Sequence, residues 1–250
     1  MNSAGVDHDR LLALAAGADG ARLAQLRQRV AAGEPAPYVA GFLEFRGRRF
    51  ASDRRAYITD PEASHLIDTV NSQGRRLEAE LGRPLRVLEF GVGAGTLAIT
   101  LKLENPQWSL GGLDIDPPAL ELGRENARAH GVDIDLIESD YLSGWPAGAP
   151  APDLMFADPP WGDAEDLYDE VRDEAWYRQM PERSAFPTGG GRTTIHDELI
   201  RRFAALRWTS LLILNYGILP RELIERSVAP LSRWQLLHPR PDISVVAGYA

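Results

Sequence analysis

Four acidic residues each lie at or near the end of a short apolar run in the sequence. They are Glu89 in "LRVLEFGVGAG", Asp114 in "LGGLD", Asp140 in "ESDYL" and Asp158 in "LMFADPPW". If the runs are strands of a parallel sheet, their carboxyl ends meet at one edge, where such sheets bind ligands. Any one of these acids could be a solvated strand end or a helix cap. Because all four occur in succession, we predict that they border a common site.

A glycine-rich turn follows the first apolar run. Gly91, Gly93 and Gly95 permit a tight turn there and let a ligand approach the backbone. The amides at the start of a following helix would add hydrogen-bond donors. Such a turn alone is a weak indication, since it also occurs as a plain strand-to-helix connection or in a dinucleotide-binding fold. Asp114, however, lies 19 residues after Gly95, and a carboxylate there can accept both hydroxyls of a ribose lying across the turn.

The spacing of the apolar residues predicts the elements that would position this site. Predicted strands cover residues 85–90, 108–116, 134–139, 152–158 and 209–217. Predicted helices cover residues 60–81, 96–104, 117–131, 193–206 and 219–230. In the fourth of these helices, Thr194 and Asp197 have the spacing of a capping box. Because strands alternate with helices, we predict an α/β fold with a mostly parallel central sheet, covered on both faces and completed by a C-terminal antiparallel strand pair over 234–238 and 243–250.

The first 60 residues carry a different pattern. The helical spacing of leucines ends at Gly33, and the segment after it alternates aromatic residues with Arg-Gly turns. We therefore predict a small N-terminal helical segment over residues 1–34, a linker and β-hairpin over 35–60, and one α/β domain over 61–250.

The motif order resembles that of class I S-adenosylmethionine-dependent methyltransferases. The order in question is Glu89-x-Gly91-x-Gly93-x-Gly95, Asp114, Asp140 and Asp158-Pro159-Pro160-Trp161. The resemblance implies a Rossmann-like fold, S-adenosyl-L-methionine as cofactor and S-adenosyl-L-homocysteine as product. In the family, the glycine loop holds the methionine part, the second-strand acid the ribose and the third-strand acid the adenine, whose ring Tyr141 or Leu142 would cover. The implied cofactor-binding residues are Glu89, Phe90, Gly91, Val92, Gly93, Asp114, Ile115, Asp140, Tyr141 and Asp158.

A more specific resemblance extends upstream. Residues 29–68, which include "GEPAPYVAGF", resemble the linker, hairpin and following helix of the HemK/PrmC protein-glutamine N-methyltransferases, and the likeness covers roughly residues 26–250. The chain also departs from that family. Its N-terminal region is shorter, Asp158 and Trp161 replace Asn and Tyr, and the stretch around Glu62 lacks the family's arginine and second acid. These departures point away from a release factor as substrate.

The tetrad Asp-Pro-Pro-Trp resembles the motif of enzymes that methylate amide or amino nitrogen. Methyl transfer from a sulfonium is an in-line displacement, so the nitrogen lone pair must be aimed at the methyl carbon from about 3–3.5 Å. Asp158 and the carbonyl of Pro159 are acceptors that could hold the N–H groups, and Trp161 could wall the nitrogen and attract positive charge. These three residues are the predicted catalytic residues, and with Glu62 they form the predicted substrate-binding set. The charge of Asp158 favours a nitrogen that becomes cationic, unless Asp and Asn are interchangeable here.

Composition narrows the classes of partner. The chain of 250 residues has a net charge of −9 and no cysteine, which disfavours nucleic acid and excludes a thiolate nucleophile or cysteine metal site. Its histidines show no metal-ligand spacing, so no metal is predicted. No apolar run approaches the roughly 20 residues that span a bilayer, and the first residues lack a signal-peptide pattern. We therefore expect no membrane partner and a cytoplasmic location. The acidic run over 163–174 is either a solvated face or a lid that attracts a cationic substrate.

The sequence thus predicts an S-adenosylmethionine-dependent N-methyltransferase. Its acceptor would be an amino, guanidino or amide nitrogen of a small molecule or peptide side chain, with a place in specialised metabolism as one option. Three alternatives stay open: methylation of an exocyclic amine in nucleic acid (adenine N6 or guanine N2), methylation of a protein glutamine, and an inactive methyltransferase fold that serves as a binding module. The sequence does not indicate an oligomeric state.

Overall fold

The computed structural model of the protein describes residues 7–161, 178–185 and 191–250. The acidic run over 163–174, for which the sequence leaves a lid or a solvated face open, lies outside the described residues. Within the described residues, no helix combines the length and the apolar character that crossing a bilayer requires.

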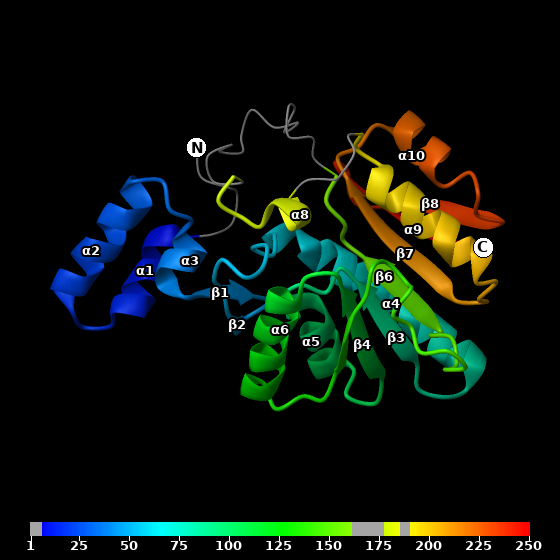
Figure 1. The fold of residues 1–250 in the computed structure, drawn as a ribbon, viewed down its shortest axis with the longest axis horizontal. Coiled ribbons are helices and arrows are strands. Elements are labelled where there is room, and N and C mark those ends of the chain that lie inside the picture. The colour runs from blue at the N-terminus through cyan, green and yellow to red at the C-terminus, as the bar shows by residue number, and fades with distance from the viewer. Residues whose placement is uncertain (1–6, 162–177, 186–190) are drawn as a thin grey trace.

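A seven-stranded sheet forms the centre of the molecule, with strand order β5-β4-β3-β6-β7-β9-β8 (Figure 1). Its strands are β3 (Arg86–Phe90), β4 (Ser109–Asp114), β5 (Asp135–Glu138), β6 (Leu154–Ala157), β7 (Leu211–Gly217), β8 (Arg233–Arg240) and β9 (Ile243–Tyr249). The pairings among β5, β4, β3, β6 and β7 are parallel, whereas β9 runs antiparallel to both β7 and β8. The predicted mostly parallel sheet with a C-terminal antiparallel pair is therefore confirmed.

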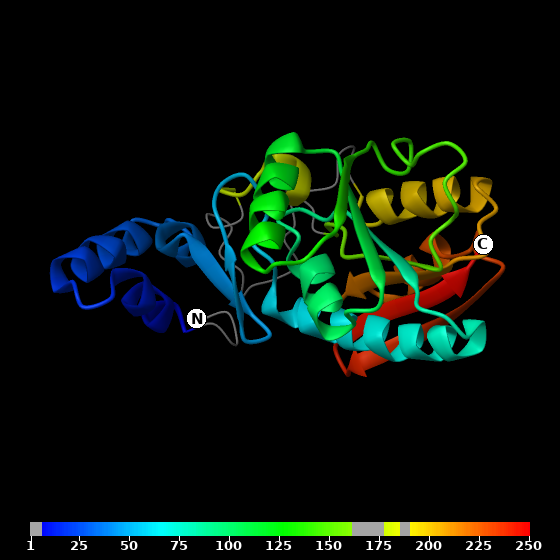
Figure 2. The same ribbon diagram turned by 90° about the horizontal axis from the view of Figure 1, so that it is seen from below.

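Helices cover both faces of this sheet (Figure 2). They are α4 (Ser64–Leu81), α5 (Thr96–Glu104), α6 (Pro117–Ala129), α9 (Thr194–Ala205) and α10 (Arg221–Ser227). Successive side chains of a strand point to opposite faces, and in β6 Phe156 packs in the core layer under α4 and α5, whereas Met155 packs in the layer under α9 and α10. The inner strands β6, β7 and β9 are apolar at nearly every position because both of their faces are buried, whereas the edge strands β5 and β8 carry polar and charged side chains.

The N-terminal residues form a small lobe that projects from the main body (Figures 1 and 2). It consists of α1 (His8–Ala16), α2 (Gly20–Ala31) and α3 (Ala36–Ala40), followed by the hairpin β1 (Phe42–Phe45) and β2 (Arg48–Ala51). Asp7 and Asp19 cap the first two helices by accepting hydrogen bonds from the backbone. The short helix α3 lies in the segment that the sequence predicts as a linker. Pro37 does not prevent this helix, because it occupies the first turn, where proline is tolerated.

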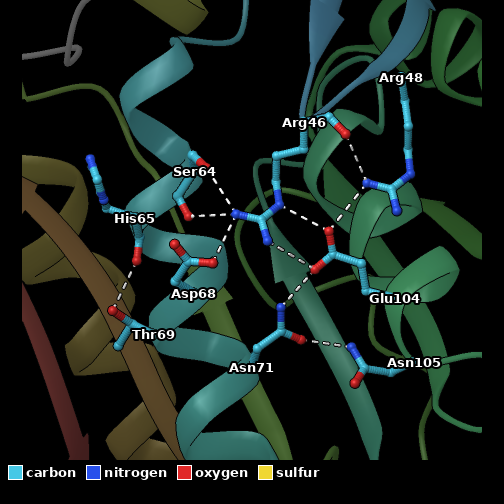
Figure 3. A network of polar contacts seen from close by, with 9 residues as sticks. All are labelled: Arg46, Arg48, Ser64, His65, Asp68, Thr69, Asn71, Glu104 and Asn105. Atoms are coloured by element: carbon cyan, nitrogen blue, oxygen red, sulfur yellow. Dashed lines mark hydrogen bonds and ion pairs between the residues drawn. The ribbon is translucent and has the colours of Figure 1, made fainter.

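A polar network fastens the hairpin to the main body (Figure 3). Arg46, at the hairpin turn, donates to Glu104 of α5 at 2.9 Å and to Asp68 of α4 at 2.8 Å. Asn71 of α4 also donates to Glu104, at 2.8 Å, and accepts from Asn105 at 2.7 Å. These contacts hold the hairpin against α4 and α5.

Two details at helix starts differ from simple expectations. The predicted capping box of Thr194 and Asp197 is wrong: α9 is preceded by Thr193 as its N-cap residue, and the Asp197 carboxylate accepts from the Thr193 hydroxyl instead of the backbone. The hydroxyl of Thr194 donates to the carbonyl of Gly191. At the start of α4, a 3-10 turn η1 (Pro61–Ala63) precedes the helix. A further short helix, α8 (Glu182–Ala185), completes the described elements.

Candidate active site

A cavity of about 440 Å³ opens at the carboxyl edge of the parallel strands. It lies where the chain reverses direction across the sheet, because β4 and β6 pair with opposite sides of β3, and such a switch point is the usual ligand site in this architecture. All of the predicted site residues line it: Glu62, Glu89, Phe90, Gly91, Val92, Gly93, Asp114, Ile115, Asp140, Tyr141, Asp158, Pro159 and Trp161.

The glycine turn after β3 leaves its backbone open toward this cavity. The amides of Gly91 and Val92 donate to the carbonyl of Leu113 at 2.8 and 3.0 Å, which folds the turn onto the end of β4. Gly91 and Gly93 have φ values of 70° and 51°, which glycine adopts without strain. A β-carbon at either position would meet no heavy atom within 4 Å. An open backbone of this kind is what the resemblance implies for the part of the site that holds the amino-acid end of S-adenosylmethionine.

A buried carboxyl group, Glu89, and a half-buried one, Asp114, flank the turn. Glu89 is 2% exposed and accepts from the Ala98 amide at 2.8 Å. Burial raises its pKa well above the usual glutamate value, and the charges of Asp158 and Asp114 raise it further. Asp114 accepts from the Gly93 amide at 2.7 Å and from the Asp116 amide at 2.9 Å; burial raises its pKa, although these amides oppose the shift. A carboxylate has about four lone-pair positions, so Asp114 retains acceptor capacity for ribose hydroxyls.

An aromatic pair forms the end of the cavity assigned to adenine by resemblance. Tyr141 stacks on Phe90 with ring centroids 5.4 Å apart, and the guanidinium of Arg202 lies 4.5 Å from the Tyr141 ring centre. Asp140 lines the cavity and pairs with Arg202 at 3.5 Å. Of the two residues predicted to cover the adenine, Tyr141 lines the cavity, whereas Leu142 is buried in the core under α9 and α10. The backbone of Tyr141 is left-handed, with φ of 51°, at the point where the side chains of Tyr141 and Leu142 turn to different surroundings.

The end of β7 supports the Asp-Pro-Pro-Trp segment. Asn215 donates from Nδ2 to Oδ1 of Asp158 at 2.7 Å, and both residues line the cavity. Gly217 lies directly against Trp161, since a β-carbon at Gly217 would come within 2.6 Å of the indole. Sequence reasoning missed Asn215 and Gly217. The signal was present, because "LLILNYG" is a further apolar run that ends in a polar residue and a glycine.

A second group of residues reaches the cavity from the segment between the hairpin and α4. Tyr57, Asp60 and Glu62 line it there, and Glu62 pairs with Arg240 at the end of β8 at 3.4 Å. Among the described residues that line the cavity, six are acidic and none is lysine or arginine. Two of these acids are paired with arginine, Glu62 with Arg240 and Asp140 with Arg202, and burial raises the pKa of Glu89, so the negative charge in the cavity is smaller than the number of its acidic side chains. Within the described part of the chain, no group of three or more acidic or histidine side chains is arranged to hold a metal ion.

Comparison with known proteins gives one consistent result. Residues 64–175 match the family model of the methyltransferase small domain. A release factor glutamine methyltransferase of Nitratidesulfovibrio vulgaris is 30% identical over 233 residues, which cover 91% of this chain and 75% of that protein. One of Deinococcus radiodurans is 38% identical over 117 residues, covering 47% of this chain and 40% of that protein. The matched stretch thus spans only about half of the relatives' length in several cases, including 56% of the relative from Enterococcus faecalis.

Solved structures share the fold at lower sequence identity. A 16S rRNA N2 methyltransferase of T. thermophilus, solved with AdoMet and guanosine, superimposes with a TM-score of 0.52 at 17% identity, over 83% of this chain and 49% of that one. An O-methyltransferase family protein of Burkholderia thailandensis gives a TM-score of 0.50 at 16% identity, over 76% of this chain and 56% of that one. At such identities the likeness establishes the architecture alone.

Proposed function

We propose that the methyl acceptor of this protein is an amino or guanidino nitrogen of a small molecule or peptide side chain. The chain belongs to the HemK-like family of class I S-adenosylmethionine-dependent methyltransferases. Family membership rests on the relative from N. vulgaris, which is matched over most of both chains. The single observation that carries the acceptor proposal is the cavity lining, which contains both Asp158 and Trp161 and, among the described residues, includes no lysine or arginine.

The cofactor half of the site would be formed by the glycine turn and the ends of β4 and β5. When bound, S-adenosylmethionine supplies an electrophilic methyl group on a sulfonium. The backbone of Gly91 and Gly93 would hold its amino-acid part, Asp114 its ribose and Tyr141 its adenine. The acidic lining would stabilise the positive charges of the cofactor.

The acceptor half would be formed by the Asp-Pro-Pro-Trp segment. Asp158 and the carbonyl of Pro159 would accept hydrogen bonds from the nitrogen, which directs its lone pair at the methyl carbon. A carboxylate stabilises a nitrogen that gains positive charge better than a neutral amide oxygen does. The face of Trp161 would exclude water and favour the same charge. Asp60 and Glu62, which reach the cavity from the segment between the hairpin and α4, would bind a second positive group of the acceptor, with Glu62 shared with Arg240.

A second candidate acceptor is the amide nitrogen of a protein glutamine. It is favoured by the curated relatives, whose names describe release factor glutamine methylation. It is disfavoured by Asp158, which replaces the family's Asn, because a neutral amide gains less from the charge of Asp158 than an amine does. Nucleic acid is a weaker alternative, since both the net charge of −9 and the acidic groups in the cavity repel phosphate.

The test is a methyl-transfer assay with radiolabelled S-adenosylmethionine and three acceptor pools: a bacterial metabolite extract, purified release factors, and bulk tRNA, rRNA and duplex DNA at low salt. Label on cationic metabolites or peptides supports the proposal. Label on release factors alone would establish the glutamine alternative, and label on nucleic acid would refute the argument from the acidic cavity. A protein that binds S-adenosylhomocysteine but labels none of the pools would favour the binding-module alternative. The Asp158→Asn variant tests the charge argument in the same assay, because it keeps the shape of the side chain and removes its charge.

A further inference from the structure

We infer that Asn215 is the positioning residue of this site: it orients the Asp158 carboxylate toward the acceptor nitrogen. The inference rests on the proposed methyl transfer and deepens it, since Asn215 lies on a different strand from the Asp-Pro-Pro-Trp segment.

Strand register brings the two side chains together. Ala157 of β6 and Leu214 of β7 are paired in the parallel ladder, so the next residues along each strand, Asp158 and Asn215, are neighbours at the carboxyl edge of the sheet. The Asn215 amide donates to Oδ1 of Asp158 at 2.7 Å, a distance typical of a strong hydrogen bond to a charged group. A donor at that distance stabilises the carboxylate over the protonated acid.

The orientation of the Asn215 amide is fixed independently of Asp158. Its oxygen Oδ1 accepts from the Gly217 amide at 3.1 Å. Because a backbone N–H can only donate, the oxygen must face Gly217 and the NH2 group must face Asp158. A reversed amide would lose the first bond and would set an oxygen against the carboxylate. Asn215 is therefore a one-way donor to Asp158.

The backbone of Asn215 is held from the other side by a buried histidine. His196 of α9 has no exposed surface, and its Nε2 lies 2.8 Å from the Asn215 carbonyl. A carbonyl only accepts, so Nε2 carries the proton. The His196 ring also stacks on Tyr216 with centroids 4.2 Å apart. These contacts fix the end of β7, and Gly217 of the same segment forms the surface on which Trp161 rests. One strand end thus positions both the charged and the aromatic member of the tetrad.

The experiment uses two cofactor analogues, so it needs no knowledge of the acceptor. Sinefungin resembles S-adenosylhomocysteine but carries an amine where the transferred methyl group would lie, and it therefore reports the charge that Asp158 presents there. Dissociation constants of both ligands are measured by calorimetry for wild type, Asn215→Ala, Asn215→Asp and the exchange variant Asp158→Asn/Asn215→Asp. Asn105→Ala is the matched control, because Asn105 is also a hydrogen-bonded asparagine but lies in the network of Figure 3, outside the cavity.

We expect Asn215→Ala to weaken sinefungin by about 3- to 10-fold relative to S-adenosylhomocysteine, since it removes one charge-assisted hydrogen bond. Asn105→Ala should lower the melting temperature and leave the ratio of the two affinities unchanged. Asn215→Asp should be less stable than wild type, because it sets two carboxylates together. The exchange variant should regain much of that stability by reversing donor and acceptor, yet keep a low preference for sinefungin, because the charge has moved away from position 158.

Two results would overturn the inference. One is an Asn215→Ala variant in which both ligands weaken equally, which would make Asn215 a purely structural residue. The other is an exchange variant no more stable than Asn215→Asp, which would show that the two side chains do not interact directly. If wild type binds neither ligand, the proposed function fails as well. If wild type binds S-adenosylhomocysteine but the ratio of the two affinities is the same in wild type and Asn215→Ala, only the positioning role fails.

Discussion

We predict that the buried carboxyl group of Glu89 lowers the free energy of unfolding of the protein at neutral pH. Glu89 is 2% exposed, and burial together with the charges of Asp158 and Asp114 raises its pKa well above the usual value of 4.5. The folded chain therefore holds a proton that the unfolded chain releases. Stability from this group is fully present below pH 4.5 and is lost as the pH rises toward the folded-state pKa.

Replacement of Glu89 by Gln removes this loss. The variant keeps the shape and an oxygen for the Ala98 amide, but it does not titrate. Within the window between the unfolded and folded pKa values, its stability relative to wild type should rise by about 1.4 kcal/mol for each pH unit. The assay is urea unfolding followed by circular dichroism at several pH values between 4 and 8.

The control is Glu138→Gln, at the exposed end of β5. It gives the baseline for exchanging a carboxyl group for an amide at an exposed strand end. A difference between Glu89→Gln and wild type that does not grow with pH would refute the reasoning, since it would mean that Glu89 is ionised as readily in the folded chain as in water. Saturating S-adenosylhomocysteine should narrow the difference, because its ammonium group would favour the ionised carboxylate.

Three further outcomes are expected. Asp114→Ala should weaken S-adenosylhomocysteine binding by about 1–3 kcal/mol through lost charge-assisted hydrogen bonds; unchanged affinity by calorimetry would remove Asp114 from the site. Gly217→Ala should displace Trp161, because its β-carbon would lie 2.6 Å from the indole at a φ of 51°, and should cost about 1–2 kcal/mol in the backbone alone; a crystal structure with Trp161 unmoved would contradict this. Asp153 accepts from Arg83 and Arg86 at the opposite edge of the sheet, and although burial raises its pKa, these contacts together hold that pKa well below the usual 3.8. Asp153→Ala should therefore lose about 1–3 kcal/mol of unfolding free energy at pH 7, with an effect that fades as the pH falls below 3.8 and with cofactor affinity unchanged; equal loss of both would argue against separate roles for the two edges.

Much of the site could be predicted because parallel topology converts a local pattern into a spatial one. An apolar run followed by an acid or a glycine can be read from a few neighbouring residues. Once the runs are parallel strands, all of their carboxyl ends lie at one edge, whatever the details of packing. Glu89, Asp114, Asp140 and Asp158 were found in this way, and all four line the cavity.

The contacts between those strand ends could not be read from the sequence. Asp158 and Asn215 are 57 positions apart, and their bond depends on the register of β6 with β7 and on the rotation of two side chains. The same holds for Glu62 and Arg240, which are 178 positions apart. No local pattern fixes such pairs, because register and rotamers are chosen by the packing of the whole core.

The sequence by itself therefore determined which residue types surround the cavity and, through the motif order, the family and its cofactor. Tertiary structure alone decided which of these groups touch: that Tyr141 and not Leu142 lines the cavity, that Thr193 and not Thr194 precedes α9, and that the end of β7 supports Asp158. The physical reason is that strand ends converge by topology, whereas hydrogen-bond partners are selected by distances of a few ångströms, which only the packed chain defines.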